Sequence, residues 1–166
     1  KSMNQPVYFD YCATTPIHPL VLKAMLPVLE SDFGNPSSMH WSGQKASEIK
    51  ENSRKMVSHG LGCQPEEIIF TSGATEADNL AIFGVLRKFS PGDAHMITCL
   101  TEHHAVLHAA EQAEKEGYAV TFLPVDQYGF VDLDVLEKSI RKETRLISIM
   151  LVNNETGTIQ PVKEIN

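Results

Sequence analysis

The sequence has 166 residues, of which 42% are hydrophobic and 21% charged, a balance typical of an ordinary soluble globular domain with a real core. The net charge of −7 is spread without long runs of one sign, which argues against a protein that binds the nucleic-acid backbone. No apolar run approaches a membrane span, and no secretory signal precedes the first motif. Three widely spaced cysteines without a CxxC pair favour a reducing compartment over a disulfide framework.

The first part of the chain predicts two helices separated by a turn. A helix is expected over 19–30, because Pro suits its first turn and Leu and Met recur at helical spacing. Gly and an Asn-Pro step favour a turn over 33–38. A more polar helix is expected over 41–59, and Gly60 or Gly62 ends it.

The rest of the chain alternates short apolar runs with helical patterns. The predicted ranges are 67–71, 95–100, 119–123 and 145–152 for strands, and 73–89, 105–116 and 132–140 for helices. Such alternation predicts an α/β fold, a three-layer and mostly parallel sheet with helices on both faces. The last residues, 161–166, resemble the first turn of a further helix, so we expect the domain to be incomplete there.

Polar residues follow three of the four predicted strands. They occupy positions 72–75, 101–104 and 153–155. Ligands of open parallel sheets bind beyond the carboxyl ends of the strands. If the strands are parallel, the three clusters therefore share one edge and line one site.

Each cluster also has a purely structural interpretation. The helix start at Ala74 and Thr75, preceded by Gly73, suits a phosphate, but strand–Gly–helix junctions are common without one. His103 could act as an acid or base or stack on an aromatic ligand, or it could be an exposed loop histidine. Asn154 could donate to a phenolic or carboxylate oxygen, or it could close the strand as a turn residue.

Two further interpretations are weighed and set aside. His103, His104 and His108 could hold zinc, since the last two are a helical i, i+4 pair, but the Glu of a metalloprotease helix is missing. We therefore predict no metal site. The three cysteines are interpreted as packed structural residues rather than nucleophiles: Cys12, Cys63 and Cys99.

Five motifs along the chain resemble, in the same order, the signatures of cysteine desulfurases in the class V aminotransferase family. They are Tyr8-Phe-Asp-Tyr-Cys-Ala-Thr-Thr-Pro16, Phe33-Gly-Asn-Pro-Ser-Ser-Met-His40, Ile69-Phe-Thr-Ser-Gly-Ala-Thr-Glu76 with Asp78-Asn-Leu80, Thr101-Glu-His-His-Ala-Val-Leu107 and Val152-Asn-Asn-Glu-Thr-Gly157. The resemblance extends over nearly the whole chain. Any one motif is weak, but five in order are highly specific.

The resemblance implies a fold-type I enzyme that binds pyridoxal 5'-phosphate (PLP). Residues 1–17 would form an arm toward the small domain, and 18–166 would be the N-terminal part of the large domain. The implied reaction removes sulfur from L-cysteine, leaving alanine and an enzyme persulfide. The implied protein is a cytoplasmic homodimer that passes sulfur to an acceptor or scaffold protein, for iron–sulfur cluster assembly or tRNA thiolation.

By motif, Ala74 and Thr75 would hold the PLP phosphate, and Asn154 would hydrogen-bond the ring hydroxyl. His103 would stack on the pyridine ring and help proton transfer, which makes it the implied catalytic residue. The family's Schiff-base lysine, pyridine-pairing aspartate and persulfide cysteine match no residue here, so we expect the 166-residue chain alone to be inactive. Alternatives are another class V PLP enzyme, such as a selenocysteine lyase or aminotransferase, or a non-catalytic half-protein.

Overall fold

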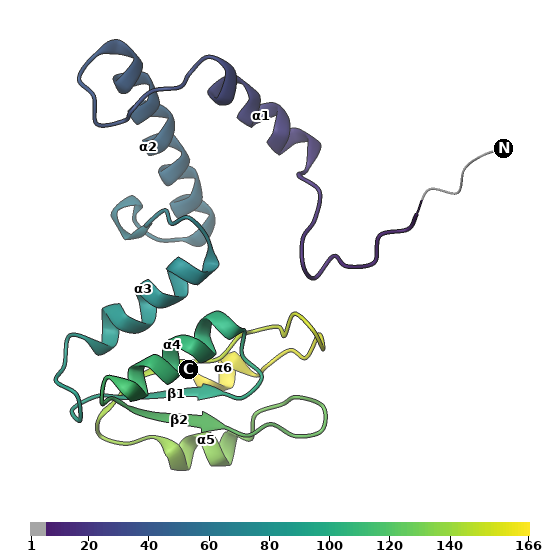
Figure 1. The fold of residues 1–166 in the computed structure, drawn as a ribbon, viewed down its shortest axis with the longest axis vertical. Coiled ribbons are helices and arrows are strands. Elements are labelled where there is room, and N and C mark those ends of the chain that lie inside the picture. Colours follow the sequence, from purple (N-terminus) through teal and green to yellow (C-terminus); the bar gives the residue numbers. More distant parts are fainter. Residues whose placement is uncertain (1–5) are drawn as a thin grey trace. The chain divides into compact units, whose positions relative to one another are not determined.

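The computed structural model describes residues 6–166, and the first five residues of the arm expected over 1–17 lie outside the described residues (Figure 1). Contacts group the chain into two compact units that divide between Phe70 and Thr71. The helices are α1 (Pro19–Glu30), α2 (Trp41–Leu61), α3 (Ala74–Leu86), α4 (His104–Lys115), α5 (Leu133–Ser139) and α6 (Val162–Ile165), with a 3₁₀ helix, η1 (Pro65–Glu67). None of these helices is long and apolar enough to cross a membrane.

In the first unit, α1 and α2 confirm the two predicted helices. The His18 imidazole caps α1, because its Nδ1 accepts the Leu20 N–H at 3.2 Å. Of the two glycines predicted to end α2, Gly62 is the one that does so. Its φ of 70° lies in the left-handed region that favours glycine.

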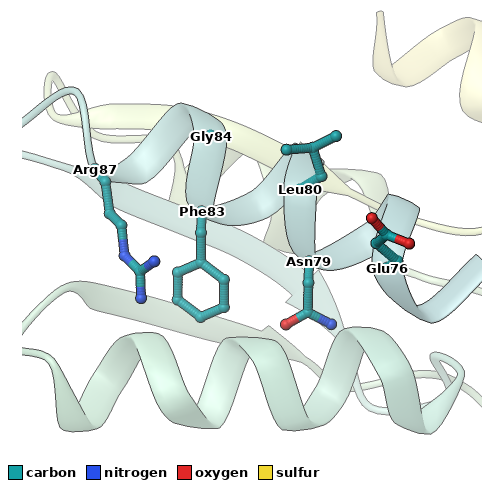
Figure 2. Close-up of a pocket in the computed structure, with 6 residues that line it drawn as sticks. All are labelled: Glu76, Asn79, Leu80, Phe83, Gly84 and Arg87. Atoms are coloured by element: carbon teal, nitrogen blue, oxygen red, sulfur yellow. The ribbon is translucent and has the colours of Figure 1, made fainter. Parts of the chain in front are cut away.

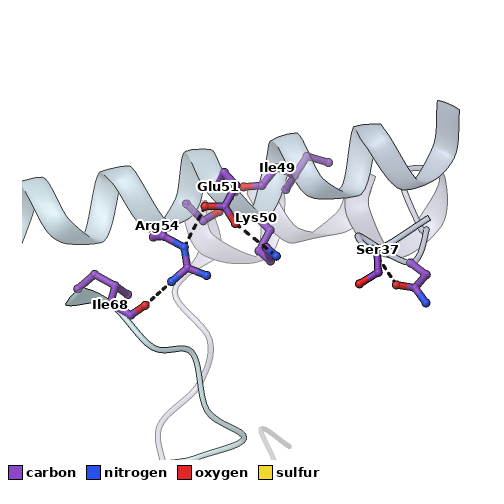
Figure 3. A network of polar contacts seen from close by, with 8 residues as sticks. Ser37, Ile49, Lys50, Glu51, Arg54 and Ile68 are labelled. Atoms are coloured by element: carbon purple, nitrogen blue, oxygen red, sulfur yellow. Dashed lines mark hydrogen bonds and ion pairs between the residues drawn. The ribbon is translucent and has the colours of Figure 1, made fainter. Parts of the chain in front are cut away.

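The turn before α2 is built around the Asn35 side chain and is packed closely by Gly43. Ser37 N–H donates to Asn35 Oδ1 at 2.9 Å (Figure 3). Ser38 N–H donates to Asn35 O at 2.9 Å. Gly43 is buried in the first turn of α2, where the backbone oxygens of Asn35 and Ser38 leave no room for a β-carbon. Gly43 is therefore required by packing.

Arg54 on α2 holds the segment that follows this helix. Its Nε donates to Glu51 Oε2 at 3.0 Å, and a guanidinium N–H donates to the carbonyl of Ile68 (Figure 3). The guanidinium also lies 5.0 Å from the centre of the Phe70 ring. This part of the first unit is thus fixed by one cation bound to a carboxylate, a carbonyl and an aromatic ring.

The strand predicted over 67–71 is wrong. Only its first residue, Glu67, lies in a regular element, the 3₁₀ helix η1, which Pro65 starts and in which Glu67 Oε2 accepts the Gln64 N–H at 2.7 Å. Ile69 and Phe70 follow in extended but unpaired backbone, 66% and 49% exposed. Within residues 6–166 no strand pairs with this segment, and an apolar run becomes a strand only when a neighbouring strand accepts its hydrogen bonds.

The second unit contains one parallel sheet in the order β2-β1-β3. Its strands are β1 (His95–Cys99), β2 (Ala119–Leu123) and β3 (Thr144–Ser148), and every residue of the central β1 is buried. On one face, α3 and α4 cover Met96 in a core rich in alanine. On the other face, Leu136 of α5 and Ile165 of α6 pack with Ile97 and Cys99. The predicted three-layer α/β fold with a parallel sheet is confirmed.

Helices α3 and α4 run side by side in the same direction. Their last turns are joined by an ion pair between Arg87 and Glu116 at 2.9 Å, and Ile82 and Leu86 pack with the alanines of α4. Because α4 begins directly after β1 ends, its first turn lies at the carboxyl edge of the sheet. The first turn of α3 therefore lies at that edge as well.

At the amino edge, the His95 imidazole ties all three strands together. Its Nδ1 lies 2.8 Å from Thr144 Oγ1 on β3, and its Nε2 lies 2.8 Å from Thr121 Oγ1 on β2. The Arg141 backbone N–H also donates to Thr144 Oγ1 at 2.8 Å. Burial lowers the pKa of His95 below its ordinary 6.5, and the charge of Arg141 lowers it further, while that of Glu143 raises it.

The lowered pKa of His95 predicts a loss of stability in acid. The contribution of His95 is fully present above about pH 6.5 and is lost as pH falls through the folded-state pKa, because the unfolded chain takes up the proton first. We expect the free energy of unfolding, measured by urea denaturation, to be lower at about pH 5 than at about pH 7.5. A His95→Asn variant, which cannot titrate there, should show a flatter pH dependence. Equal slopes for the two proteins would contradict this role.

The packing of Gly43 predicts opposite effects of the same substitution at two positions of α2. Gly43→Ala drives a β-carbon into backbone oxygens and should destabilise the protein by about 2 kcal/mol. Gly60→Ala meets no atom within 4 Å and should stabilise the helix by up to about 1 kcal/mol. Urea unfolding midpoints of the two variants check the pair, and a Gly43→Ala protein as stable as the parent would refute the packing argument.

Candidate functional site

Three segments meet the carboxyl edge of the sheet, and each carries one of the predicted clusters. Residues 100–103 lead from β1 into α4, and residues 149–154 follow β3. Residues 71–73 lead into α3, whose first turn lies at the same edge. The second and third clusters follow parallel strands to one edge, as predicted, whereas the first follows an unpaired segment and lies at that edge through the packing of α3 along α4.

His103 is the N-cap of α4. Its Nδ1 accepts the Ala105 N–H at 3.1 Å, so that in the neutral ring the proton is on Nε2. The side chain is exposed, and the His104 ring lies edge-on to it with centroids 6.4 Å apart. The helix cap thus fixes one end of the imidazole while one N–H and the ring face remain open to a ligand.

Of the two neighbouring asparagines, Asn154 is exposed and Asn153 is buried. Asn154 Nδ2 donates to the carboxylate of the adjacent Glu155 at 3.0 Å. Asn153 Nδ2 donates to the carbonyl of Thr101 at 2.7 Å, and its Oδ1 accepts the N–H groups of Glu155 and Thr156, both at 2.9 Å. The first amide is available to a ligand, whereas the second holds the loop.

Glu102 is a buried carboxyl between the end of β1 and the His103 cap. Its Oε1 accepts the Met150 N–H at 2.5 Å, and the Cys99 sulfur lies 4.0 Å away. Burial raises the pKa of Glu102, opposed by the N–H groups of Met150 and His103. Its role was not predicted from the sequence. The signal in the sequence was a carboxylate two residues after the strand predicted over 95–100.

Ala74 and Thr75 form the exposed first turn of α3. Gly73 precedes them with a φ of 167°, which is extended backbone, and no atom lies within 4 Å of the position of its β-carbon. The carboxylate of Glu76 turns back to Ser72, accepting its N–H at 2.8 Å and its hydroxyl at 2.6 Å, and these bonds lower the pKa of Glu76. The N–H groups of this first turn point out of the helix with its positive dipole end.

A shallow hollow of about 600 Å³ runs along α3 from Glu76 to Arg87 (Figure 2). Phe83 lies in the middle of the hollow with the Arg87 guanidinium 4.3 Å from its ring centre. None of the predicted site residues lines it. Among residues 6–166, no three His, Cys, Asp or Glu side chains converge to hold a metal ion.

Comparison with known proteins gives the family. The family model described as "Aminotransferase class-V" matches residues 7–166. The chain belongs to the class V aminotransferase family.

Relatives within the family are cysteine desulfurases. The chain is 49% identical over 164 residues to "Cysteine desulfurase IscS" of Dictyoglomus turgidum, which covers 99% of this chain and 42% of that protein. It is 46% identical over 166 residues to the protein of the same name from Rickettsia prowazekii, covering 99% and 40%. The chain thus spans about two fifths of the length of these relatives.

Solved structures give the same fold. A NifS-like protein superposes with a TM-score of 0.92 at 41% identity, over 97% of this chain and 44% of the other. The structure of SspA in complex with cysteine superposes with a TM-score of 0.88 at 40% identity, over 95% and 46%. The α/β fold with its parallel sheet is that of these enzymes.

The residues at the carboxyl edge of the sheet match the chemical groups of PLP. An open helix start without an obstructing side chain suits the phosphate, and Thr75 adds an exposed hydroxyl. An exposed amide at Asn154 and an imidazole with a free N–H at His103 suit a hydroxylated aromatic ring. The residues present fit the cofactor.

The site residues do not include a reactive cysteine. Cys99 lies at the end of β1 and is fully buried, and burial raises its pKa. Its thiol is therefore protonated near neutral pH, and the Thr101 hydroxyl lies 3.6 Å from the sulfur. Cys63 is half-buried, and Cys12 is exposed, so the interpretation of Cys12 as a packed residue is wrong.

We expect Cys99 to resist alkylation in the folded protein. Iodoacetamide reacts with exposed thiolate, so at neutral pH Cys12 should be labelled well before Cys99, and denaturation in urea should make both react. Mass spectrometry of peptides at successive times measures the two rates. Labelling of Cys99 as fast in the native protein as in urea would show that the end of β1 is open.

Proposed function

We propose that the protein is a PLP-dependent cysteine desulfurase, which removes sulfur from L-cysteine and leaves alanine and an enzyme persulfide. The observation that carries the proposal is the convergence, at one sheet edge, of a free helix start, a capped imidazole with a free N–H and an exposed amide. The relatives named cysteine desulfurase, and the neighbour SspA in complex with cysteine, support this choice of substrate.

Each residue at the edge has a part in holding the cofactor. Bound PLP supplies an electron sink for bond changes at the amino acid's α-carbon. Ala74 and Thr75 bind the phosphate through backbone N–H groups and a hydroxyl at the positive end of α3. Asn154 donates to the ring hydroxyl, and His103 stacks on the pyridine ring with its free Nε2–H available for proton transfer.

Other parts of the proposed reaction need residues that the 166-residue sequence does not contain. These are the Schiff-base lysine, the aspartate for the pyridine nitrogen and the persulfide cysteine. We propose residues 1–17 as an arm and 18–166 as part of the PLP-binding domain, in a cytoplasmic homodimer that passes sulfur to an acceptor or scaffold protein. Iron–sulfur cluster assembly or tRNA thiolation would consume the sulfur.

The proposal predicts products and a phosphate-specific defect. The full-length gene product with PLP, L-cysteine and a thiol reductant should form alanine and sulfide in equal amounts, whereas the 166 residues alone should form neither. Thr75→Val should weaken PLP binding about tenfold by removing a hydrogen bond to a charged group. Product assays and cofactor titrations provide the measurements.

Pyridoxal without its phosphate is the internal control for Thr75. Its affinity should not change in Thr75→Val, because the hydroxyl is proposed to contact the phosphate alone. Equal weakening of both ligands would overturn the assignment of Thr75. Absence of alanine from the full-length protein would overturn the desulfurase, and turnover of selenocysteine but not cysteine would identify a different class V enzyme.

A further inference from the structure

We infer that Glu102 and Asn153 are positioning residues that lock the loop carrying His103 to the loop carrying Asn154. The inference rests on the proposed function, since it assigns these two residues to the same site. Neither would touch the cofactor itself. Each lies next in sequence to a residue proposed to do so.

The two side chains form a reciprocal pair of cross-links. From the β1 loop, Glu102 Oε1 accepts the Met150 N–H of the β3 loop at 2.5 Å. From the β3 loop, Asn153 Nδ2 donates to the Thr101 carbonyl of the β1 loop at 2.7 Å. Each side chain thus binds the backbone of the opposite loop, within a few residues of the other cross-link. Two bonds in opposite directions prevent the loops from sliding or rotating past each other.

Both residues are buried, which makes the cross-links costly to break. Glu102 is 8% exposed and Asn153 is 7% exposed. Loss of either side chain leaves a backbone N–H or carbonyl of the opposite loop without its partner, away from water. A buried polar group with a single good partner fixes geometry more sharply than apolar packing, which tolerates small shifts.

The Asn153 side chain has separate tasks at its two ends. Its Oδ1 accepts the N–H groups of Glu155 and Thr156 and so shapes its own loop, while Nδ2 makes the link to Thr101. Aspartate keeps the first function and loses the second, because a carboxylate cannot donate. Asn153→Asp therefore removes the cross-link, together with the 3.3 Å contact of Nδ2 with Met150 Sδ, and keeps the bonds that shape its own loop.

Glu102 needs its acceptor but not its charge. Burial and the carboxylate of Asp78 favour the neutral form, and Oε1 can accept the Met150 N–H in either form. Glutamine has the same length and keeps a carbonyl acceptor. Glu102→Gln is thus the conservative rescue, and Glu102→Ala is the disruptive variant.

Gln160 offers a matched control in the same unit. It is 3% exposed and also binds backbone across a large sequence separation, accepting the Val131 N–H at 3.1 Å and donating to the carbonyl of Gly129 at 2.6 Å. Its side chain bonds only residues 129 and 131 and none of the residues of the two cross-links, while its backbone N–H, which alanine keeps, donates to Leu151 O of the β3 loop at 2.8 Å. Gln160→Ala should destabilise the protein without affecting the site.

The test compares these four variants in the full-length gene product. Hydrogen–deuterium exchange without PLP measures directly how firmly the two loops are held. Glu102→Ala should speed exchange over 150–156, and Asn153→Asp should speed it over 100–105. PLP affinity should fall about tenfold in both variants, and the visible circular dichroism of bound PLP should change. Glu102→Gln should match the parent within about threefold, and Gln160→Ala should leave PLP affinity and dichroism unchanged.

Two outcomes overturn the inference. One is unchanged exchange in the opposite loop, and the other is a loss of affinity in Gln160→Ala equal to that in the two disruptive variants, which would reflect general destabilisation. If Glu102→Ala does not fold, Asn153→Asp, which keeps volume and loop structure, decides the question. Failure of the parent to bind PLP would refute the proposed function, while the exchange data without PLP still test the lock.

Discussion

The parallel pairing of β1 with both of its neighbours is the constraint on which the second unit depends. β1 has its hydrogen-bonding groups satisfied on two sides and all five residues buried, so it can neither shift register nor leave the sheet without breaking both ladders. Parallel strands bring their carboxyl ends to one edge. That geometry, and no local feature of the loops, brings segments 50 residues apart in the sequence together.

Side-chain hydrogen bonds hold both edges of this sheet together, but the chemical groups differ. At the amino edge, a neutral imidazole bridges hydroxyls on both outer strands. At the carboxyl edge, Glu102 and Asn153 join backbone to side chain between two loops. Strand pairing alone ends where the ladders end, so side chains must continue the connection beyond them. The proposed site lies where this second kind of connection takes over, and its rigidity therefore depends on a few polar contacts.

The local sequence pattern was sufficient to predict the helices and strands whose stability is largely local or whose burial is complete. Periodicity, a Pro in the first turn of α1 and a Gly at the end of α2 predicted their bounds closely, and α5 begins after the Asp132 cap within the predicted range 132–140. The segment 67–71 has an apolar composition equal to that of the true strands, yet it lacks a partner strand among the described residues. Pairing is a property of the neighbour as well as of the run, so composition could not distinguish them.

The same limit applies to the site. The positions proposed to touch the cofactor could be identified from the sequence because each lies in a motif of consecutive residues, around Thr75, His103 and Asn154. The role of Glu102 could not be identified in this way, since it depends on the backbone of Met150, which only the folded sheet brings within reach. Asn153 and Asn154 are neighbouring residues of the same type, and the burial of one and exposure of the other follow from the loop that the fold imposes.

The apolar side chains of helix α1 have no covering surface among the described contacts. The helix has 12 residues and buries none of them within the described part of the chain, although most of its side chains are apolar. A helix of this length is marginal by itself in water and is normally stabilised by packing of its apolar face. Its leucines therefore require a covering surface from outside these contacts. The proposed homodimer, and the remainder of a protein as long as the relatives, are the two sources consistent with a chain that spans about two fifths of their length.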